Sequence, residues 1–482
     1  MKYPSKQKAV KSIKRTLLRF TGRRITKAVQ RIYQILYKIF IEIKYIIYSL
    51  RPQFFLRFLR RTQRNTSQKV LRWHIDVDIR NFRELKKYFD EAGVRYAAGK
   101  HTVYIPPRTG RIPALNKITG FYPADAGFKI LKTNRSVEDA EYKNEELSRP
   151  WGRSQLLGKV TENVGASNYL ELKSVGPRIY DLTEFDFNGF VVPVFIVQHI
   201  NGRAPDSEET KEFKRHLRRV LEEKDVVYAH PQWETHVDFQ GDSCHGNLIK
   251  SKQNGQLYYV DFQNFILPDS SRVLKRICRE SRASSHFGTK HIIRGGSYLY
   301  QSVDSVNAYG KRSTKCRERV MSGLFTQADA DFDGAYVLDI GCNMGMMLAW
   351  GLDQGARWAL GWDRPQVVKQ AYQLLKIMGY TRFDLYGTDL NNDYKVSQDI
   401  SGRFQLGNEN VIIFYLAVHR HIGFLSDLVS IPWKYMLYEG HQGEELRELD
   451  SLKRICRFDI AAYTFYEDGD SKRRPLALVR KR

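Results

Sequence analysis

The feature that most restricts the fold of this chain is an alternation of apolar segments and glycine turns that starts at Tyr336. It reads YVLDIGCNMGMMLAWGLDQGARWALGWDRPQVVKQAYQLL: an apolar run, a glycine turn, a helical pattern, a second apolar run ending in an acid, and a second helical pattern. Strands that alternate with helices in this way form a mostly parallel sheet with helices on its faces. The stretch predicts a doubly wound α/β sheet, which binds ligands at the carboxyl ends of its strands.

Glycines and acids stand where these predicted strands end. Gly341 and Gly345 are spaced GxxxG rather than GxGxxG, which disfavours a dinucleotide site and a nicotinamide enzyme. Asp363 ends the second strand, 22 residues after Gly341, and a carboxylate there can accept hydrogen bonds from both hydroxyls of a ribose. Asp389 follows the third strand, where a turn aspartate that caps a helix would look the same.

The segment DIGCNMG resembles motif I of class I S-adenosylmethionine-dependent methyltransferases, and the resemblance extends over about residues 310–482. Its last part, FDIAAYTFYEDGDSKRRPLALVRKR, reads as two strands around a DGD turn, similar to the closing hairpin of that family. The resemblance implies S-adenosylmethionine as cofactor and these residues around it: Asp339, Gly341, Asn343, Gly345, Asp363 and Asp389.

Two histidines, His419 and His421, follow the fourth predicted strand, NVIIFYLAVHRHIG, at the end where an acceptor should lie. We expect His419 to act as a base or to position the acceptor, although a histidine with a purely structural role fits the same position.

A second constellation lies upstream, in GDSCHGNLIKSKQNGQLYYVDFQNF. Phosphoryl transfer needs an acid that accepts or orients the attacking hydroxyl, and oxygen ligands for the magnesium ions that bridge the phosphates. Asp242, Asn247 and Asp261 are those residue types in that order. Farther upstream, GFKILK places Lys129 on a strand before the acidic helical pattern SVEDAEYKNEEL. A strand lysine held by a helix glutamate can address nucleotide phosphates.

This region resembles aminoglycoside-phosphotransferase-like and lipopolysaccharide-type kinases, whose pattern is HGDLHPGN followed by a strand and DFG. The resemblance implies a two-lobed kinase-like fold that uses ATP and Mg²⁺, with Asp242 catalytic, and Asn247 and Asp261 as metal ligands. Lys129 and Glu145 would bind the nucleotide, with Glu141 as the alternative partner of the lysine.

Three departures from the kinase pattern leave a degenerate, non-catalytic binding module open as an alternative. Gln240 replaces the usual histidine, DFQ replaces DFG, and KITGFYPADAGF lacks a GxGxxG loop. The pattern disfavours a eukaryotic-type protein kinase and favours a small-molecule, glycan or lipid acceptor.

The positive charge of the chain is concentrated at its start. Residues 1–72 hold 20 of the 78 Lys and Arg and one acid, Glu42, which gives +19; the remainder carries 58 minus 52, or +6. Residues 32–50 place apolar side chains on one helical stripe, but Lys38, Glu42 and Lys44 interrupt any spanning segment. We expect a basic amphipathic helix on an anionic membrane surface. A helix packed on the protein or on a partner, and a transit peptide, are the alternatives.

Together these patterns predict a multidomain α+β and α/β chain. The predicted divisions are a membrane-association segment (1–72), a kinase-like domain (73–295), a connector (296–326) and a Rossmann-like methyltransferase domain (327–482). The five cysteines are far apart and without a CxxC pair, so we expect free thiols.

The content of the chain is similar to that of bacterial methyltransferase/kinase enzymes that terminate O-antigen polysaccharides on lipid carriers, although the order of the domains differs. The resemblance implies a cytoplasmic enzyme on the inner face of the membrane that phosphorylates and methylates a glycan or glycolipid, and leaves the oligomeric state open. A nucleic-acid methyltransferase is the alternative; it predicts salt-sensitive binding through residues 1–72. Against it, we find no interleaved basic and aromatic patch outside them.

Overall fold

The structure is a computed structural model of the 482-residue chain. Residues 65–482 form one compact unit, to which all described residues belong. No helix among them is both long and apolar enough to cross a bilayer. Residues 1–69 lie outside the described part, so the membrane association of the basic segment stays a prediction. The structure describes residues 70–98, 102–107, 115, 118, 120–131, 164–223, 225–228, 247–260, 265–267, 269–283, 288–290, 297–308, 310–391, 393–401, 404, 406, 410–441, 446–467 and 473–482.

The first sheet has six strands in the order β1-β5-β6-β4-β3-β2, antiparallel except where β1 lies parallel to β5. Helix α4 (Phe82–Glu91), capped by the Asn81 side chain, buries Phe82, Leu85 and Phe89 against it. Strand β1, helix α4 and strand β2 therefore follow one another in the chain at the start of this sheet. The strands are β1 (Leu71–His74), β2 (Ala97–Ala98), β3 (Thr102–Ile105), β4 (Ala126–Leu131), β5 (Ile179–Phe187) and β6 (Phe190–Gln198).

Short strands and two longer helices follow. Strands β10-β9-β7 form one small sheet, β11 pairs with β8, and β12-β13-β14 form another sheet. The elements are β7 (Gly202–Arg203), α7 (Ser207–Glu222), β8 (Val227–Tyr228), β9 (Leu248–Ser251), β10 (Leu257–Tyr259), β11 (Phe265–Ile266), α9 (Ser270–Ala283), β12 (Gly288–Lys290), β13 (Ser297–Gln301), η4 (Asp304–Val306) and β14 (Gly310–Arg312).

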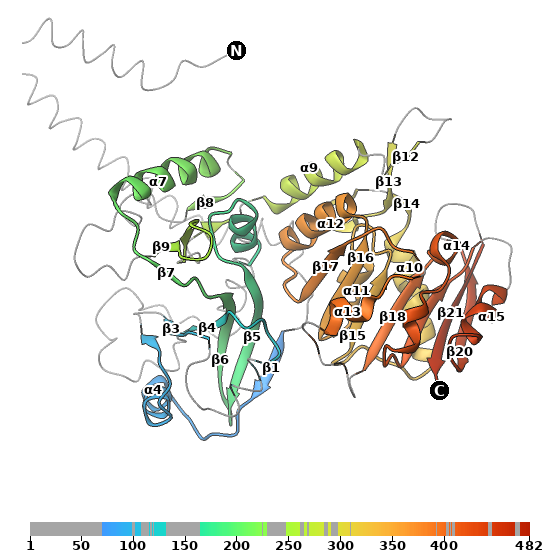
Figure 1. Ribbon diagram of the computed structural model, residues 1–482, viewed down its shortest axis with the longest axis horizontal. Helices are drawn as coiled ribbons and strands as arrows, with labels where there is room; N and C mark the ends of the chain where they lie inside the picture. The colour runs from blue at the N-terminus through green and yellow to red at the C-terminus, as the bar shows by residue number, and fades with distance from the viewer. Residues whose placement is uncertain are drawn as a thin grey trace, which may run out of the picture. The chain divides into compact units, whose positions relative to one another are not determined.

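The second large sheet has seven strands in the order β17-β16-β15-β18-β19-β21-β20. The first five are parallel, and β21 is antiparallel to both of its neighbours. Figure 1 shows its labelled strands in this order. The strands are β15 (Tyr336–Ile340), β16 (Trp358–Asp363), β17 (Phe383–Gly387), β18 (Val411–Leu416), β19 (Tyr435–Glu439), β20 (Phe458–Tyr466) and β21 (Arg474–Lys481).

The strand order reverses between β15 and β18, so the predicted doubly wound sheet and its closing hairpin are confirmed as a fold. The helices of this part are α10 (Thr314–Gln327), α11 (Met346–Asp353), α12 (Pro365–Ile377), α13 (Val396–Ser401), α14 (His419–Ile422) and α15 (Leu449–Lys453), with 3₁₀ turns η5 (Ser426–Val429) and η6 (Leu446–Glu448).

The central strands β15, β16, β18 and β19 are buried on both faces, as continuous apolar runs predict, whereas the edge strand β20 alternates between buried and exposed side chains. Val337 packs in the same apolar cluster as Met321 of α10 and Met347 of α11. Its neighbour Leu338 packs in a different cluster, with Leu452 of α15. Because successive side chains of a strand point to opposite faces, Asp339 lies on the face that α10 and α11 cover.

The compact unit has two halves, one built around the six-stranded sheet and the other around the seven-stranded sheet, and they meet along α12. Residues 164–172 are helical, and Lys376 Nζ of α12 lies 2.8 Å from Glu171 Oε2. Asn168 Nδ2 donates to the Lys376 carbonyl oxygen at 2.9 Å. Burial lowers the pKa of Lys376, an effect that Glu171 opposes. One apolar cluster includes side chains from both halves, so they share a core.

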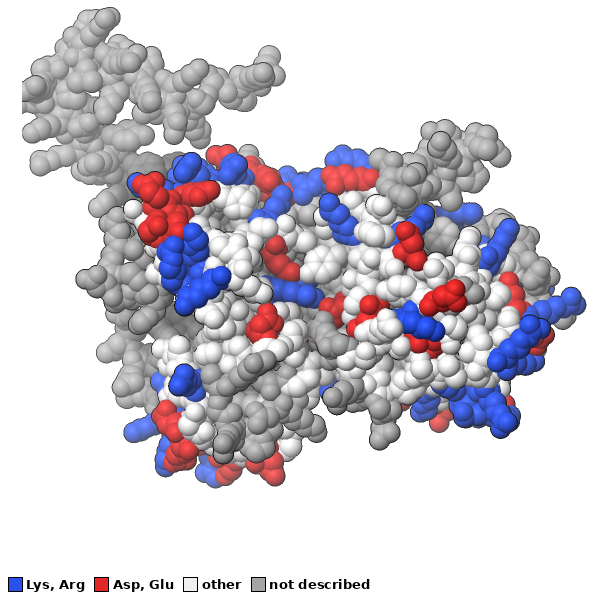
Figure 2. Space-filling model, in the orientation of Figure 1, with Lys and Arg blue, Asp and Glu red and all other residues white. Residues whose placement is uncertain are grey.

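Figure 2 shows acidic and basic side chains interspersed over the visible described surface. This agrees with the small net charge outside residues 1–72. The four described cysteines, Cys278, Cys316, Cys342 and Cys456, are free thiols, as expected.

Candidate functional site

The glycine turn after β15 is held tightly against β16. Gly341 and Gly345 have φ of +82° and +75°, and Asn343 between them has φ of +49°. The Gly341 and Cys342 amides both donate to the Trp362 carbonyl oxygen, at 2.9 and 3.0 Å. The turn therefore needs left-handed backbone at three positions, and glycine supplies it without strain at two of them.

Replacing Gly345 by alanine is expected to destabilise the fold by about 2–3 kcal/mol. A Cβ atom there would lie 2.8 Å from Leu375 Cδ1, in addition to the cost of a left-handed residue. Gly334 is the matched control, since its φ is +68° and a Cβ atom would have nothing within 4 Å. Urea unfolding measures both variants; an equal loss in Gly334→Ala would show that packing against Leu375 contributes nothing.

Asp363 organises this turn from the end of β16. Its Oδ2 accepts from the Asn343 amide at 2.8 Å, and its Oδ1 accepts from the Arg364 amide at 2.8 Å. The side chain is half-buried at the carboxyl end of β16. Asp363, which the sequence predicts to bind the ribose, is thus in direct contact with the predicted glycine turn.

Two buried oxygen atoms lack a hydrogen-bond partner within the described part of the chain: Asp339 Oδ2 at the end of β15 and Asn343 Oδ1 in the turn. Burial raises the pKa of Asp339 to about 7, an effect that Arg317 opposes and Asp363 reinforces. Buried acceptors without donors are costly, so their presence at a strand end fits a ligand that supplies N–H donors.

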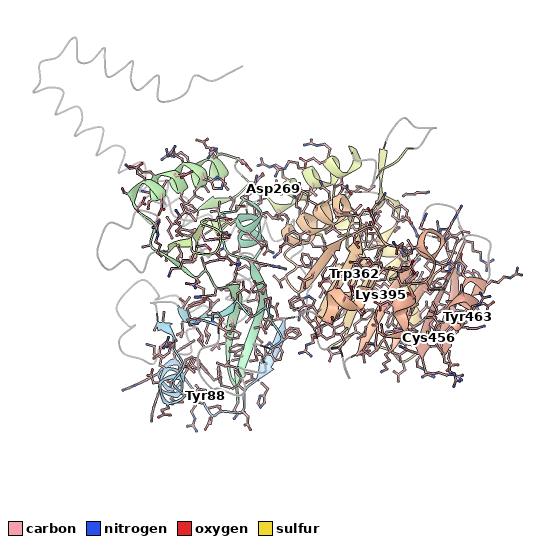
Figure 3. The ribbon with its side chains drawn as sticks, viewed as in Figure 1. Tyr88, Asp269, Trp362, Lys395, Cys456 and Tyr463 are labelled. Atoms are coloured by element: carbon pink, nitrogen blue, oxygen red, sulfur yellow. The ribbon has the colours of Figure 1, made fainter. Side chains whose placement is uncertain are left out.

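Two aromatic side chains pack in the core beside the end of β16. Trp362, which Figure 3 marks in β16, stacks on Tyr386 with ring centroids 5.1 Å apart and donates to Asp399 at 2.7 Å. Asp389 is exposed two residues beyond β17, so it lies at the carboxyl edge. Its predicted role beside the adenine stays a prediction.

His419 begins α14, directly after β18. Its Nδ1 lies 3.7 Å from Glu448 Oε2, and its ring contacts Phe424 with centroids 4.4 Å apart. Tyr438 of β19 also donates to Glu448. Val418, the residue before His419, stands over Gly341, where a Cβ atom would lie 3.1 Å from Val418 Cγ2. The histidine is therefore at the same edge as the glycine turn.

These residues fit S-adenosylmethionine by their chemistry. Asp363 offers a carboxylate for a diol, and Asp339 and Asn343 offer acceptors for an ammonium group. All of them lie at the carboxyl ends of β15 and β16, beside the reversal of strand order where such sheets bind ligands.

The predicted kinase-like site is described only in part. Lys129 in β4 is 8% exposed, and its Nζ donates to the Val260 carbonyl oxygen at 3.4 Å. The Val260 amide donates to the Asn247 carbonyl oxygen at 2.6 Å. The lysine thus reaches the strand that leads to Asp261, although 131 residues separate it from Val260.

The other predicted residues of that site, Asp242, Asp261, Glu141 and Glu145, lie outside the described residues. Within the described ranges no group of three or more His, Cys, Asp or Glu side chains could hold a metal ion. The roles of Asn247 and Asp261 as magnesium ligands stay predictions.

Comparison with known proteins gives likenesses of fold only. No family model matches the sequence, and a search of curated proteins found no match. Among solved structures, a SAM-dependent methyltransferase from Aquifex aeolicus is 12% identical, with 34% of this chain and 89% of that chain covered at a TM-score of 0.26. Magnesium protoporphyrin IX methyltransferase from Synechocystis PCC 6803 is 17% identical, with 35% and 84% covered at 0.24. The m1A22 tRNA methyltransferase of B. subtilis is 14% identical, with 33% and 65% covered at 0.24.

Sequence reasoning missed a buried charge cluster at the same edge, formed by Arg312, Arg317, Arg474 and Glu439. Its members are up to 162 positions apart (474 minus 312) in the sequence, so no local pattern joins them. The one available signal was Glu439 itself, an acid that ends the apolar strand YMLYE.

Proposed function

We propose that the chain is an S-adenosylmethionine-dependent methyltransferase. The observation that carries the proposal is the contact between the glycine turn and Asp363, beside the unpartnered oxygen atoms of Asp339 and Asn343. The bound cofactor would supply an electrophilic methyl group. Asp363 would bind the ribose hydroxyls, while Asp339 and Asn343 would orient the amino-acid end through its ammonium group.

The acceptor end of the site would lie beyond β18 and β19. His419, close to Glu448, would position the acceptor or take its proton when the acceptor is a hydroxyl group. The apolar surroundings of the histidine, with Phe424 against its ring, would limit the access of water.

Binding of S-adenosylhomocysteine is expected to strengthen about 10-fold between pH 6 and pH 8. Only an ionised Asp339 attracts the ammonium group, and a pKa of about 7 leaves it about one-tenth ionised at pH 6. Calorimetry at several pH values measures the change. Asp339→Asn should remove it, and 5′-methylthioadenosine, which lacks the amino-acid end, should not show it. An equal pH dependence for both ligands would contradict this role of Asp339.

We further propose that residues 73–295 bind magnesium-ATP and phosphorylate a glycan or glycolipid that the other half methylates. Its support is the buried Lys129, which bonds to the residue before Asp261, and the order Asp242, Asn247, Asp261. The basic segment would keep the enzyme at the inner face of an anionic membrane, where one acceptor meets both sites at high effective concentration.

The experiment that tests both sites is calorimetric titration of the full chain with S-adenosylhomocysteine and, separately, with magnesium-ATP. Lys129→Met is expected to weaken ATP binding at least about 10-fold, because a charge-assisted contact to phosphate is lost. Lys252→Met, at an exposed lysine, is the matched control. Binding of S-adenosylhomocysteine without ATP would leave a methyltransferase with a kinase-like binding module, and failure of S-adenosylhomocysteine to bind would contradict the methyltransferase.

A further inference from the structure

Three of the four most exposed large apolar side chains among the described residues lie on strand β20. They are Tyr463, Ile460 and Phe465, with exposed fractions of 60%, 42% and 37%. Figure 3 labels Tyr463 on this strand. Their register partners on β21 are alternate residues, so the three side chains share one face of the sheet: Ala477, Val479 and Pro475. Exposed apolar side chains that gather in one place mark an interaction surface.

The same strand forms one edge of the seven-stranded sheet. Among the described strands, only β21 pairs with β20, and Figure 1 shows β20 at the outer end of the sheet. With nine residues it is longer than the other edge strands of the two large sheets, β17 (five), β1 (four) and β2 (two). Strand β17 also contacts the first half of the chain, since Arg178 donates to Asp384 at 3.2 Å. The outer edge of β20 is therefore the longest stretch of backbone available for pairing with another strand.

The sequence of β20 offers little protection against such pairing. Natural edge strands are kept apart by lysines and other charged side chains, by prolines, by bulges or by being short. FDIAAYTFY holds no lysine or proline and one charge, Asp459, which accepts from Arg482 Nε at 2.6 Å. A bulge lies between Ile460 and Ala462, but the pairing with β21 is regular from Ala462 to Tyr466.

The two ends of β20 carry opposite charges. Residues 453–457, KRICR, lead into the strand with three positive charges, and residues 467–470, EDGD, follow it with three negative charges. Arg457 and Glu467, the charged residues next to the strand at either end, are both exposed. An antiparallel partner strand with the same sequence would place its acidic end beside the basic end of β20, and its basic end beside the acidic end.

We infer that β20 pairs in antiparallel fashion with β20 of a second copy of this chain, so that two seven-stranded sheets join into one. Pairing centred near Ala462 would bring Arg457 of each copy close to Glu467 of the other, because both lie five residues from Ala462 (462 minus 457, 467 minus 462). The two-fold symmetry of such a dimer makes every favourable contact twice. The inference concerns assembly and does not depend on either proposed activity.

The charges favour a second copy over the other partners that an apolar edge could bind. An anionic membrane surface would attract the basic end of β20 but repel EDGD at the acidic end. A uniformly acidic or uniformly basic peptide strand would likewise match one end and oppose the other. A second copy matches both ends at once.

The first test is sedimentation velocity of the full chain from about 1 µM to about 100 µM, because a small strand-to-strand interface is expected to dissociate at about micromolar concentrations. We expect a dimer that forms as the concentration rises. Tyr463→Lys should raise its dissociation constant at least about 10-fold, since a lysine on an edge strand opposes pairing. Urea unfolding like that of the wild type would show that this variant folds, as expected for a residue that is 60% exposed.

Val429→Lys is the matched control. Val429 is the fourth exposed apolar residue, 56% exposed, but its carbonyl oxygen accepts from Lys481 of β21 and it lies outside β20. This variant should dimerise as the wild type does. An equal loss of dimer in Val429→Lys and Tyr463→Lys would overturn pairing through β20, as would an unchanged dissociation constant in Tyr463→Lys or a chain that stays monomeric at about 100 µM.

A charge exchange tests the antiparallel arrangement. Arg457→Glu and Glu467→Arg should each weaken the dimer, because each brings like charges together at both ends of the interface. The double variant restores opposite charges at both ends, so its dissociation constant should return toward that of the wild type. A double variant that is weaker than either single variant would contradict the antiparallel pairing.

Discussion

Replacing Asp363 by alanine is expected to weaken the binding of S-adenosylhomocysteine at least about 100-fold. Each hydrogen bond to a charged group contributes about 1.5 kcal/mol or more, and two ribose hydroxyls would lose their acceptor together. The same carboxylate accepts from the Asn343 and Arg364 amides, so the glycine turn would also lose its anchor. Titration calorimetry on the full chain measures the loss.

Asp393→Ala is the control for this prediction, because Asp393 is an exposed acid of the same part of the chain, beyond β17. It should bind S-adenosylhomocysteine as the wild type does. A loss of less than about 10-fold in Asp363→Ala would mean that the ribose is held elsewhere. Adenine contacts near Asp389 would then have to carry most of the affinity.

Replacing Glu439 by glutamine is expected to cost about 3–5 kcal/mol of unfolding free energy. Removing one member of a buried ion pair leaves the remaining charge uncompensated, and here three guanidinium groups share the carboxylate. Urea unfolding followed by circular dichroism measures the change.

Asp459→Asn is the matched control, since Asp459 pairs with Arg482 at the surface and the pair is screened by water. Its unfolding midpoint should equal that of the wild type. If Glu439→Gln were as stable as Asp459→Asn, the three guanidinium groups would not depend on the Glu439 carboxylate, and the charge argument would be wrong.

The sequence predicted the α/β half of the fold well because its signals are local. The central strands of the seven-stranded sheet are short apolar runs, and candidate acids and glycines stand at their ends, as Asp363 ends WALGWD. Parallel strands bring their carboxyl ends to one edge, so positions far apart in the chain could be placed together without knowing any side-chain contact.

The remaining features depend on contacts that no local pattern encodes. Arg312 and Glu439 are 127 residues apart, and neither stands in a recognisable motif. The packing of Asn168 against α12, which joins the two halves, involves residues 208 apart. The sequence places Lys129 on a strand, but its contact with Val260, 131 residues away, depends on the tertiary structure and has no local signal.

The position of β21 has a consequence for how the protein is made. This strand follows β20 in the chain but lies between β19 and β20, and it is the neighbour that joins β20 to the sheet. While the ribosome is still adding residues 458–466, the growing sheet can therefore extend no farther than β19. Until β21 emerges, the edge of β19 that will later pair with β21 is unpaired. This edge and the side chains of β20 are then accessible to chaperones and to other nascent chains.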